Sequence, residues 1–220
     1  MNDVLGVSQT VDHALKILRE PVERLFGAAW NEIGGALGDR VRHWRDMRRL
    51  ELALAAVAKL RAKGIDPQTV EPSILFPILD AGSLATDAFL KEKWAKLLAT
   101  AANPRAEIDM TPSFAEILKQ LTPLEARILD WVEKSGDPEA HQQSETFVVV
   151  AVSLSALQRE FSLSAYDADV IASNLARLGL VDTMASAVNN VAAGEPVPQP
   201  SYRRFALTPI AVRFMGACKD

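Results

Sequence analysis

Apolar residues recur at helical spacing in the middle of the chain, and each helical stretch has its own start signal. Three segments follow one another between residues 72 and 129 with little spacer: SILFPILDAGSL, LKEKWAKLLA and PSFAEILKQLTPLEARIL. The start signals are Pro72, Thr86 with Asp87, Thr111 with Pro112, and a capping box of Thr122, Pro123 and Glu125. Capping oxygens and first-turn prolines mark helix N-termini. The pattern predicts four short helices, and Pro77 should kink or divide the first.

A longer apolar stripe lies upstream of these helices. It runs from Val22 to Trp44 through Leu25, Phe26, Trp30, Ile33, Leu37 and Val41, and it is interrupted by Gly27, Gly34, Gly35 and Gly38. Each glycine inside a helix costs roughly 0.5 to 1 kcal/mol relative to alanine, so this segment needs a neighbour to hold it. The segment from Arg40 to Lys63 is a strong helix former, and Gly64 should end it.

The pattern changes after residue 135. TFVVVAV at 146–152 is a β-run, and Ser155 and Ser164 should cap two short helices. Two strands follow, at 180–184 and 202–207, and Thr208 with Pro209 should start a final helix. Helix, strand, helix, helix, two strands, helix is the order of a winged helix-turn-helix. We therefore expect a mainly α protein, with a helical domain at 1–110 and a winged-helix-like domain with a small β-sheet at 111–220.

The net charge of −4 is unevenly distributed. Eight Lys and Arg against three Asp and Glu lie between Gly38 and Gly64, whereas residues 112–220 hold nine against thirteen. A basic helix on an acidic protein favours contact with an anionic surface or with the protein's own acidic part. The candidate contacts to phosphate or to an anionic surface are Arg40, Arg45, Arg48, Arg49, Arg203 and Arg204.

The helix expected at 165–178 would be the DNA-reading helix of a winged helix. Tyr166, Val170, Ile171, Leu175 and Leu178 are expected on its buried face. The opposite face is then formed by Ala165, Asp169, Ala172, Ser173 and Ala176. This face lacks cations, so we expect DNA binding to be weak and non-specific. Small side chains permit close approach, which favours protein contact at these residues, with a second copy of the chain as the simplest partner.

Residues with the spacing of a catalytic or metal-binding motif are missing from the sequence. The three histidines are scattered, no phosphate-binding loop or GxSxG is present, and Cys218, the single cysteine, is expected to fill space in the last helix. We therefore expect a non-enzymatic protein without a cofactor or metal. No secretory signal and no run of roughly 18 apolar residues is present, so a cytoplasmic location is expected.

Several segments resemble the abortive infection alpha (Abi-alpha) family of bacterial phage-defence proteins. They are GDRVRHW at 38–44, LFPILDAGSL, WAKLLA at 94–99 and PSFAEILKQLTPLEARIL. Outside them the likeness is to winged-helix proteins in general, around LGLV and FALTP. The resemblance implies antiviral defence in which an infected cell halts or dies before phage matures. It brings no catalytic residues with it.

These observations lead to one hypothesis and two alternatives. The hypothesis is a phage-defence protein that acts through protein contacts as a homo-oligomer. The first alternative is a DNA-binding transcriptional regulator. The second is an effector at the inner membrane surface, in which residues 22–49 lie in the lipid interface and their arginines meet anionic head groups.

Overall fold

The computed structural model describes residues 20–27, 40–135, 151–185 and 203–219. This part of the chain is mainly helical, as predicted, with a small antiparallel sheet. The chain divides into two compact units, residues 1–123 with 216–220 and residues 124–215. The division falls later than the expected boundary at 110/111, because the helix that follows Thr111 packs within the first unit.

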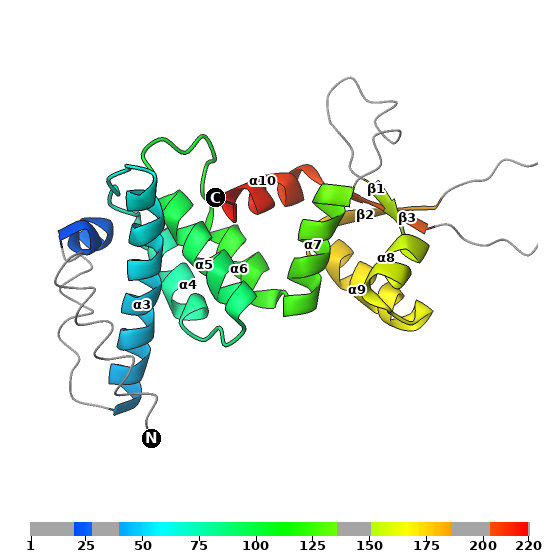
Figure 1. The fold of residues 1–220 in the computed structure, drawn as a ribbon, viewed down its shortest axis with the longest axis horizontal. Coiled ribbons are helices and arrows are strands. Elements are labelled where there is room, and N and C mark those ends of the chain that lie inside the picture. The colour runs from blue at the N-terminus through cyan, green and yellow to red at the C-terminus, as the bar shows by residue number, and fades with distance from the viewer. Residues whose placement is uncertain (1–19, 28–39, 136–150, 186–202, 220) are drawn as a thin grey trace, which may run out of the picture. The chain divides into compact units, whose positions relative to one another are not determined.

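Four helices form the described body of the first unit: α3 (Arg40–Ala62), α4 (Pro72–Gly82), α5 (Ala88–Ala101) and α6 (Pro112–Gln120). Helix α3 packs against α4 and α5, while α4 also contacts α5 and α6 (Figure 1). Buried side chains on all four helices form the core, among them Val57, Leu75, Ile78, Leu79, Leu97, Leu98 and Leu118. Burial of these apolar side chains is what holds the helices together.

The helix ends of this unit follow the local signals. Pro72 and Pro112 lie in the first turns of α4 and α6, and the Asp87 carboxylate accepts a hydrogen bond from the Leu90 N–H at 3.0 Å at the start of α5. Gly64 has a φ of +67°, which suits glycine and ends α3. Pro77 does not divide its segment, since α4 continues through it.

Gly82 marks a close approach among α3, α4 and α5. A Cβ atom at this position would lie 2.6 Å from Leu52 Cδ2 and 3.2 Å from Trp94 Cγ. Only glycine fits there without displacement of both neighbours. Trp94 is only 2% exposed, so its interpretation as a core residue is confirmed.

A short helix at residues 20–26 is tied to the loop between α3 and α4. The Val70 N–H donates to the Leu25 carbonyl at 3.1 Å, and Thr69 Oγ1 donates to the Arg24 carbonyl at 2.8 Å. Val22, Leu25 and Phe26 are buried. Packing of the upstream stripe is thereby confirmed at these three residues. Trp30, Ile33 and Leu37, and the side chain of Trp44, lie outside the described part.

The second unit contains helices and strands in the expected order. They are α7 (Pro123–Ser135), β1 (Ala151–Ser153), α8 (Leu154–Phe161), α9 (Ala165–Arg177), β2 (Val181–Ala185), β3 (Arg203–Leu207) and α10 (Pro209–Ala217), whose last two residues belong to the first unit. Strand β3 lies between β1 and β2 and pairs antiparallel with both. Phe205 is opposite Val152 on one side and Thr183 on the other.

Two of the three serine and threonine caps predicted in this unit are confirmed, and one is wrong. Ser164 accepts from the Asp167 N–H at 3.1 Å, and Thr208 accepts from the Ala211 N–H at 3.2 Å. Helix α8 is capped by Ser153 and not by Ser155, because β1 leads directly into the helix and the Ser153 hydroxyl accepts from the Ala156 N–H. Cys218 is buried just beyond α10, as expected of an apolar filler.

Truncation of Trp94 to alanine should destabilise the protein by about 3 to 5 kcal/mol, because it removes a buried aromatic side chain and leaves a cavity. Tyr166→Ala is the matched control, since Tyr166 is 76% exposed, and it should change stability by no more than about 0.5 kcal/mol. Urea unfolding measures both. A loss of similar size in the two variants would contradict the assignment of Trp94 to the core.

Candidate functional site

Helix α9 presents a different face to solvent from the one its apolar pattern predicts. Ala168, Ile171, Ala172 and Leu175 are buried, whereas Tyr166 and Val170 are 76% and 50% exposed. The expectation that Tyr166 and Val170 lie on the buried face is therefore wrong. Helix α9 packs against α8 and β2, and small alanine side chains on the buried face allow such a close approach.

The exposed side of α9 carries Tyr166, Val170, Ser173 and Arg177, which we call the α9 outer face. Steps of four, three and four residues bring these side chains onto one side of a helix. Tyr166 and Val170, one turn apart, form a small exposed apolar area. The Ser173 hydroxyl and the Arg177 guanidinium lie toward the other end of this face. Tyrosine and arginine are enriched in protein interfaces.

The five residues proposed from the sequence for partner binding do not share one exposed surface. Ala165 and Ser173 are exposed, and Asp169 and Ala176 are half-buried. Ala172 is only 7% exposed and belongs to the core, so its assignment to a partner-binding surface is corrected. The sequence analysis missed Tyr166 and Val170, because apolar side chains on a helix are normally assigned to its buried face.

A series of side-chain hydrogen bonds inside the second unit connects α9 to α7. Glu125 of α7 is only 4% exposed, and its Oε1 accepts a hydrogen bond from Asn174 Nδ2 at 2.6 Å. The side-chain oxygen of Asn174, Oδ1, in turn accepts hydrogen bonds from Arg177 Nε and Nη2 at 3.1 and 2.8 Å. A buried carboxylate is costly unless charge-assisted hydrogen bonds stabilise it. This series of hydrogen bonds therefore connects the interior at Glu125 to the outer face at Arg177.

Helix α8 is held against α7 by an aromatic pair. The rings of Trp131 and Phe161 are 5.7 Å apart at an interplanar angle of 87°, the edge-to-face arrangement that aromatic rings prefer. Helices α8 and α9 are thus both anchored on α7, the first by ring packing and the second by Glu125. The α9 outer face therefore belongs to a helix that is tied to α7.

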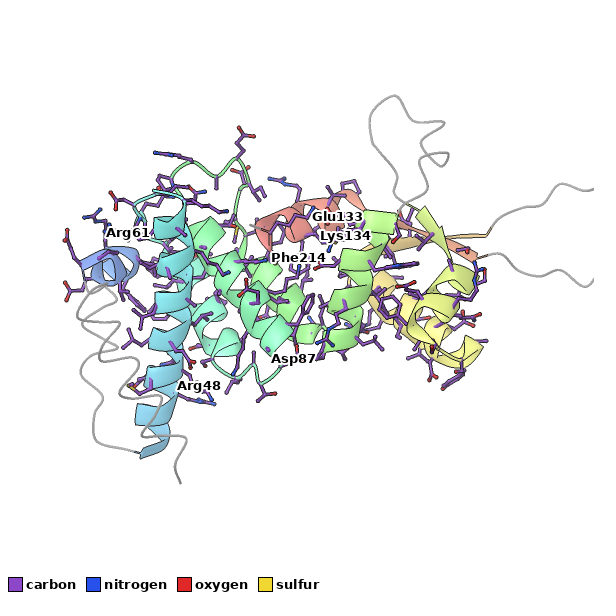
Figure 2. The ribbon with its side chains drawn as sticks, in the orientation of Figure 1. Arg48, Arg61, Asp87, Glu133, Lys134 and Phe214 are labelled. Atoms are coloured by element: carbon purple, nitrogen blue, oxygen red, sulfur yellow. The ribbon has the colours of Figure 1, made fainter. Side chains whose placement is uncertain are left out.

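The arginines proposed for anionic contact lie in different settings. Arg45 is exposed, while Arg48 pairs with Glu51 at 2.9 Å on the same helix, on which Figure 2 labels Arg48. Arg49 pairs with Asp46 at 3.0 Å and with Asp80 of α4 at 2.6 Å. Arg48 and Arg49 thus serve contacts within the unit. The side chains of Arg40, Arg203 and Arg204 lie outside the described part, and β3 begins at Arg203.

The sequence matches the abortive infection alpha family over residues 47–218. The chain belongs to this family. The match leaves out GDRVRHW at 38–44, covers the other segments that carried the sequence resemblance, and includes the described helices and strands of the second unit. No curated protein and no solved structure matches the chain. Membership of the abortive infection alpha family suggests a role in abortive-infection defence.

Among residues 20–27, 40–135, 151–185 and 203–219 of this family member, no group of three His, Cys, Asp or Glu side chains is placed to hold a metal ion. No helix within them has the length and apolar character needed to cross a bilayer.

Asn174→Ala should destabilise this family member by about 1.5 to 3 kcal/mol, because it removes a hydrogen-bond donor to the buried Glu125 carboxylate. Ser173→Ala, at the exposed neighbouring position, should change the free energy of unfolding by no more than about 0.5 kcal/mol. Chemical denaturation of the two variants checks this. Equal stability of wild type and Asn174→Ala would show that the Glu125 bond does not hold α9.

Proposed function

We propose that the chain protects bacteria against phage through protein contact and without catalysis, and that the α9 outer face is the contact surface. The observation that carries the proposal is the 76% exposure of Tyr166 next to the exposed Val170 on an anchored helix. Family membership supplies the defence role. The contact surface on α9 is proposed from the exposure of these two side chains.

Protein contact suits the chemistry of this face. Covering Tyr166 and Val170 removes apolar surface from water, while the Tyr166 hydroxyl and the Arg177 guanidinium supply polar contacts at the edge. Side chains on a rigid helix lose little further freedom on binding, so less of the binding free energy is lost to ordering. We take a second copy of the chain as the partner, because contacts between identical chains are the commonest form of assembly.

We further propose that the second unit is a winged helix-turn-helix. The order α7, β1, α8, α9, β2, β3, α10 and the position of β3 between β1 and β2 support this. Helix α9 would then be the second helix of the pair, the one that enters the major groove in DNA-binding members of this class. In this chain we assign it to a protein partner.

Regulation of transcription through DNA is the alternative that the winged-helix order favours. Donors to base edges and cations near phosphates would be required on α9. Its exposed residues include Asp167, whose carboxylate accepts from the Ser164 hydroxyl at 2.6 Å, and Arg177 already donates to Asn174. We therefore propose only weak, non-specific DNA binding. Nanomolar, sequence-selective binding of duplex DNA at physiological salt, lost in Arg177→Ala, would favour the regulator instead.

The second alternative is an effector that binds the inner membrane surface through residues 22–49. It requires apolar residues of the segment 22–49 to be available to lipid, whereas Val22, Leu25 and Phe26 are buried. The ion pairs of Arg48 and Arg49 also occupy cations that anionic head groups would need. We therefore favour the cytoplasm. Co-sedimentation with anionic vesicles that Arg45→Ala abolishes would favour the membrane.

Val170→Asp should abolish protection of cells against phage, because it places a charge in the contact surface. Val212→Asp is the matched control, since Val212 is 46% exposed on α10 of the same unit and Val170 is 50% exposed on α9. The measurement is plating efficiency and burst size in cells that carry each variant at equal protein level, over a panel of phages.

Three results test the α9 contact and the defence role separately. Loss of protection in Val170→Asp with protection retained in Val212→Asp supports the α9 contact. Full protection by a folded Val170→Asp protein refutes the α9 contact and leaves the defence role intact. Absence of protection by the wild type against every phage tested counts against the defence role itself.

A further inference from the structure

A cavity of about 210 Å³ lies in the first unit, between the middle of α3 and the first half of α5. Small residues at facing positions leave this space open: Ala55 of α3, Gly82 at the end of α4, and Ala88 and Ala95 of α5. The buried side chains of Leu52 and Ala95 give the cavity an apolar floor. The cavity shares no residue with the α9 outer face.

Most polar groups that line the cavity already have partners within the chain. The buried Ser83 hydroxyl donates to the Asp80 carbonyl at 3.0 Å. The charged lining residues, which we call the rim, are Arg48, Glu51, Lys91 and Glu92. Arg48 pairs with Glu51 at 2.9 Å, and Glu92 forms ion pairs with two lysines. A charged ligand would have to displace these pairs, whereas an apolar group fills the space and leaves them intact. The cavity therefore suits an apolar occupant.

Leu84 lies next to this cavity and does not fill it. It stands between two lining residues, Ser83 and Ala85, yet it is not part of the lining and is 51% exposed. The N–H groups of residues 83–85 donate to carbonyl groups of the last turn of α4 at 3.0 to 3.2 Å, so hydrogen bonds fix the loop that presents it. A single exposed leucine is ordinary on a protein surface. Here, however, an apolar projection and an apolar cavity are neighbours.

A projection and a cavity that are neighbours on one surface are complementary to a second copy of that surface. In a two-fold dimer the same patch of each subunit meets itself, so every contact is made twice. A leucine beside the cavity of its own chain then enters the cavity of the other chain, and the exchange is mutual. Both apolar groups are removed from water in one contact.

The charges of the rim also suit contact with a second copy. Two cations, Arg48 and Lys91, stand against two carboxylates, Glu51 and Glu92, and Figure 2 labels Arg48. A surface that meets itself must not carry a single sign of charge, because like charges then repel across the interface. The balanced rim meets this condition. Nucleic acids and anionic membranes instead favour a cationic surface.

We propose that Leu84 enters this cavity of a second copy of the chain, and that two copies associate by the mutual exchange. The cavity is smaller than the roughly 300 to 1,000 Å³ of sites for drug-sized ligands, which suits a single side chain. This contact belongs to the first unit, whereas the proposed α9 contact belongs to the second. A chain with two self-contact surfaces links more than two copies. The proposal goes beyond the α9 contact and does not depend on it.

Sedimentation equilibrium of the full chain tests the proposal in a Val170→Asp background, in which the α9 contact is disrupted. Leu84→Asp should weaken the remaining self-association at least tenfold, because it offers a charge to an apolar cavity. Thr86→Asp is the matched control, since it adds the same charge at an exposed position of the same loop, outside the lining. It should leave the association unchanged.

Disulfide formation between two variants reads the contact itself. Leu84→Cys and Ala55→Cys proteins are mixed and oxidised, and mass spectrometry should find a peptide that joins positions 84 and 55. Cys218, the single native cysteine, is buried and gives little background. Leu84→Cys mixed with Lys119→Cys should give no such product, because Lys119 lies on α6 and does not line the cavity.

Three results would overturn the proposal. The first is equal association of the Leu84→Asp and Thr86→Asp proteins, which includes a Val170→Asp protein that stays monomeric throughout and leaves the α9 contact standing. The second is absence of the peptide that joins positions 84 and 55. The third is an Ala55→Cys protein that resists a thiol reagent even as a monomer, which shows that the chain's own residues fill the cavity.

Discussion

The buried carboxylate of Glu125 is the constraint on which the second unit depends. A charged group taken out of water costs several kcal/mol, and the cost is offset only where donors are fixed around it. Asn174 supplies such a donor 49 residues away, and this bond ties α9 to α7. Helix α9 also packs against α8 and β2. In this arrangement Ala168 and Ala172 are buried, whereas Tyr166 and Val170 are exposed to solvent and form the candidate contact surface.

The first unit is organised by close packing and by charge at its helix ends. Gly82 lets α4 approach Leu52 of α3 and Trp94 of α5, which closes the apolar core. A second cavity lies near the ends of α3 and α5 and is lined by Lys59 and Lys96 among others.

Local signals in the sequence predicted most helix ends, whereas contacts between residues far apart in the sequence were not predicted. The caps at Asp87 and Ser164 and the stop at Gly64 were predictable because each acts within a few residues. The outward position of Tyr166 was not, because it depends on how α9 packs against β2 and on a bond to Glu125. Lys59 and Lys219 line the same cavity, although no periodic pattern in the sequence connects these positions. Glu125 itself was predicted only as a capping residue, although it is buried in the unit.

Photo-crosslinking tests the central claim, that the α9 outer face contacts protein, most directly. A photoreactive phenylalanine analogue is placed at Tyr166 in one protein and at Val212 in another, and cells are irradiated during phage infection. The account predicts a crosslinked species of twice the mass of the chain from position 166 and none from position 212. No crosslinked protein from position 166, or equal crosslinking from both positions, would contradict it.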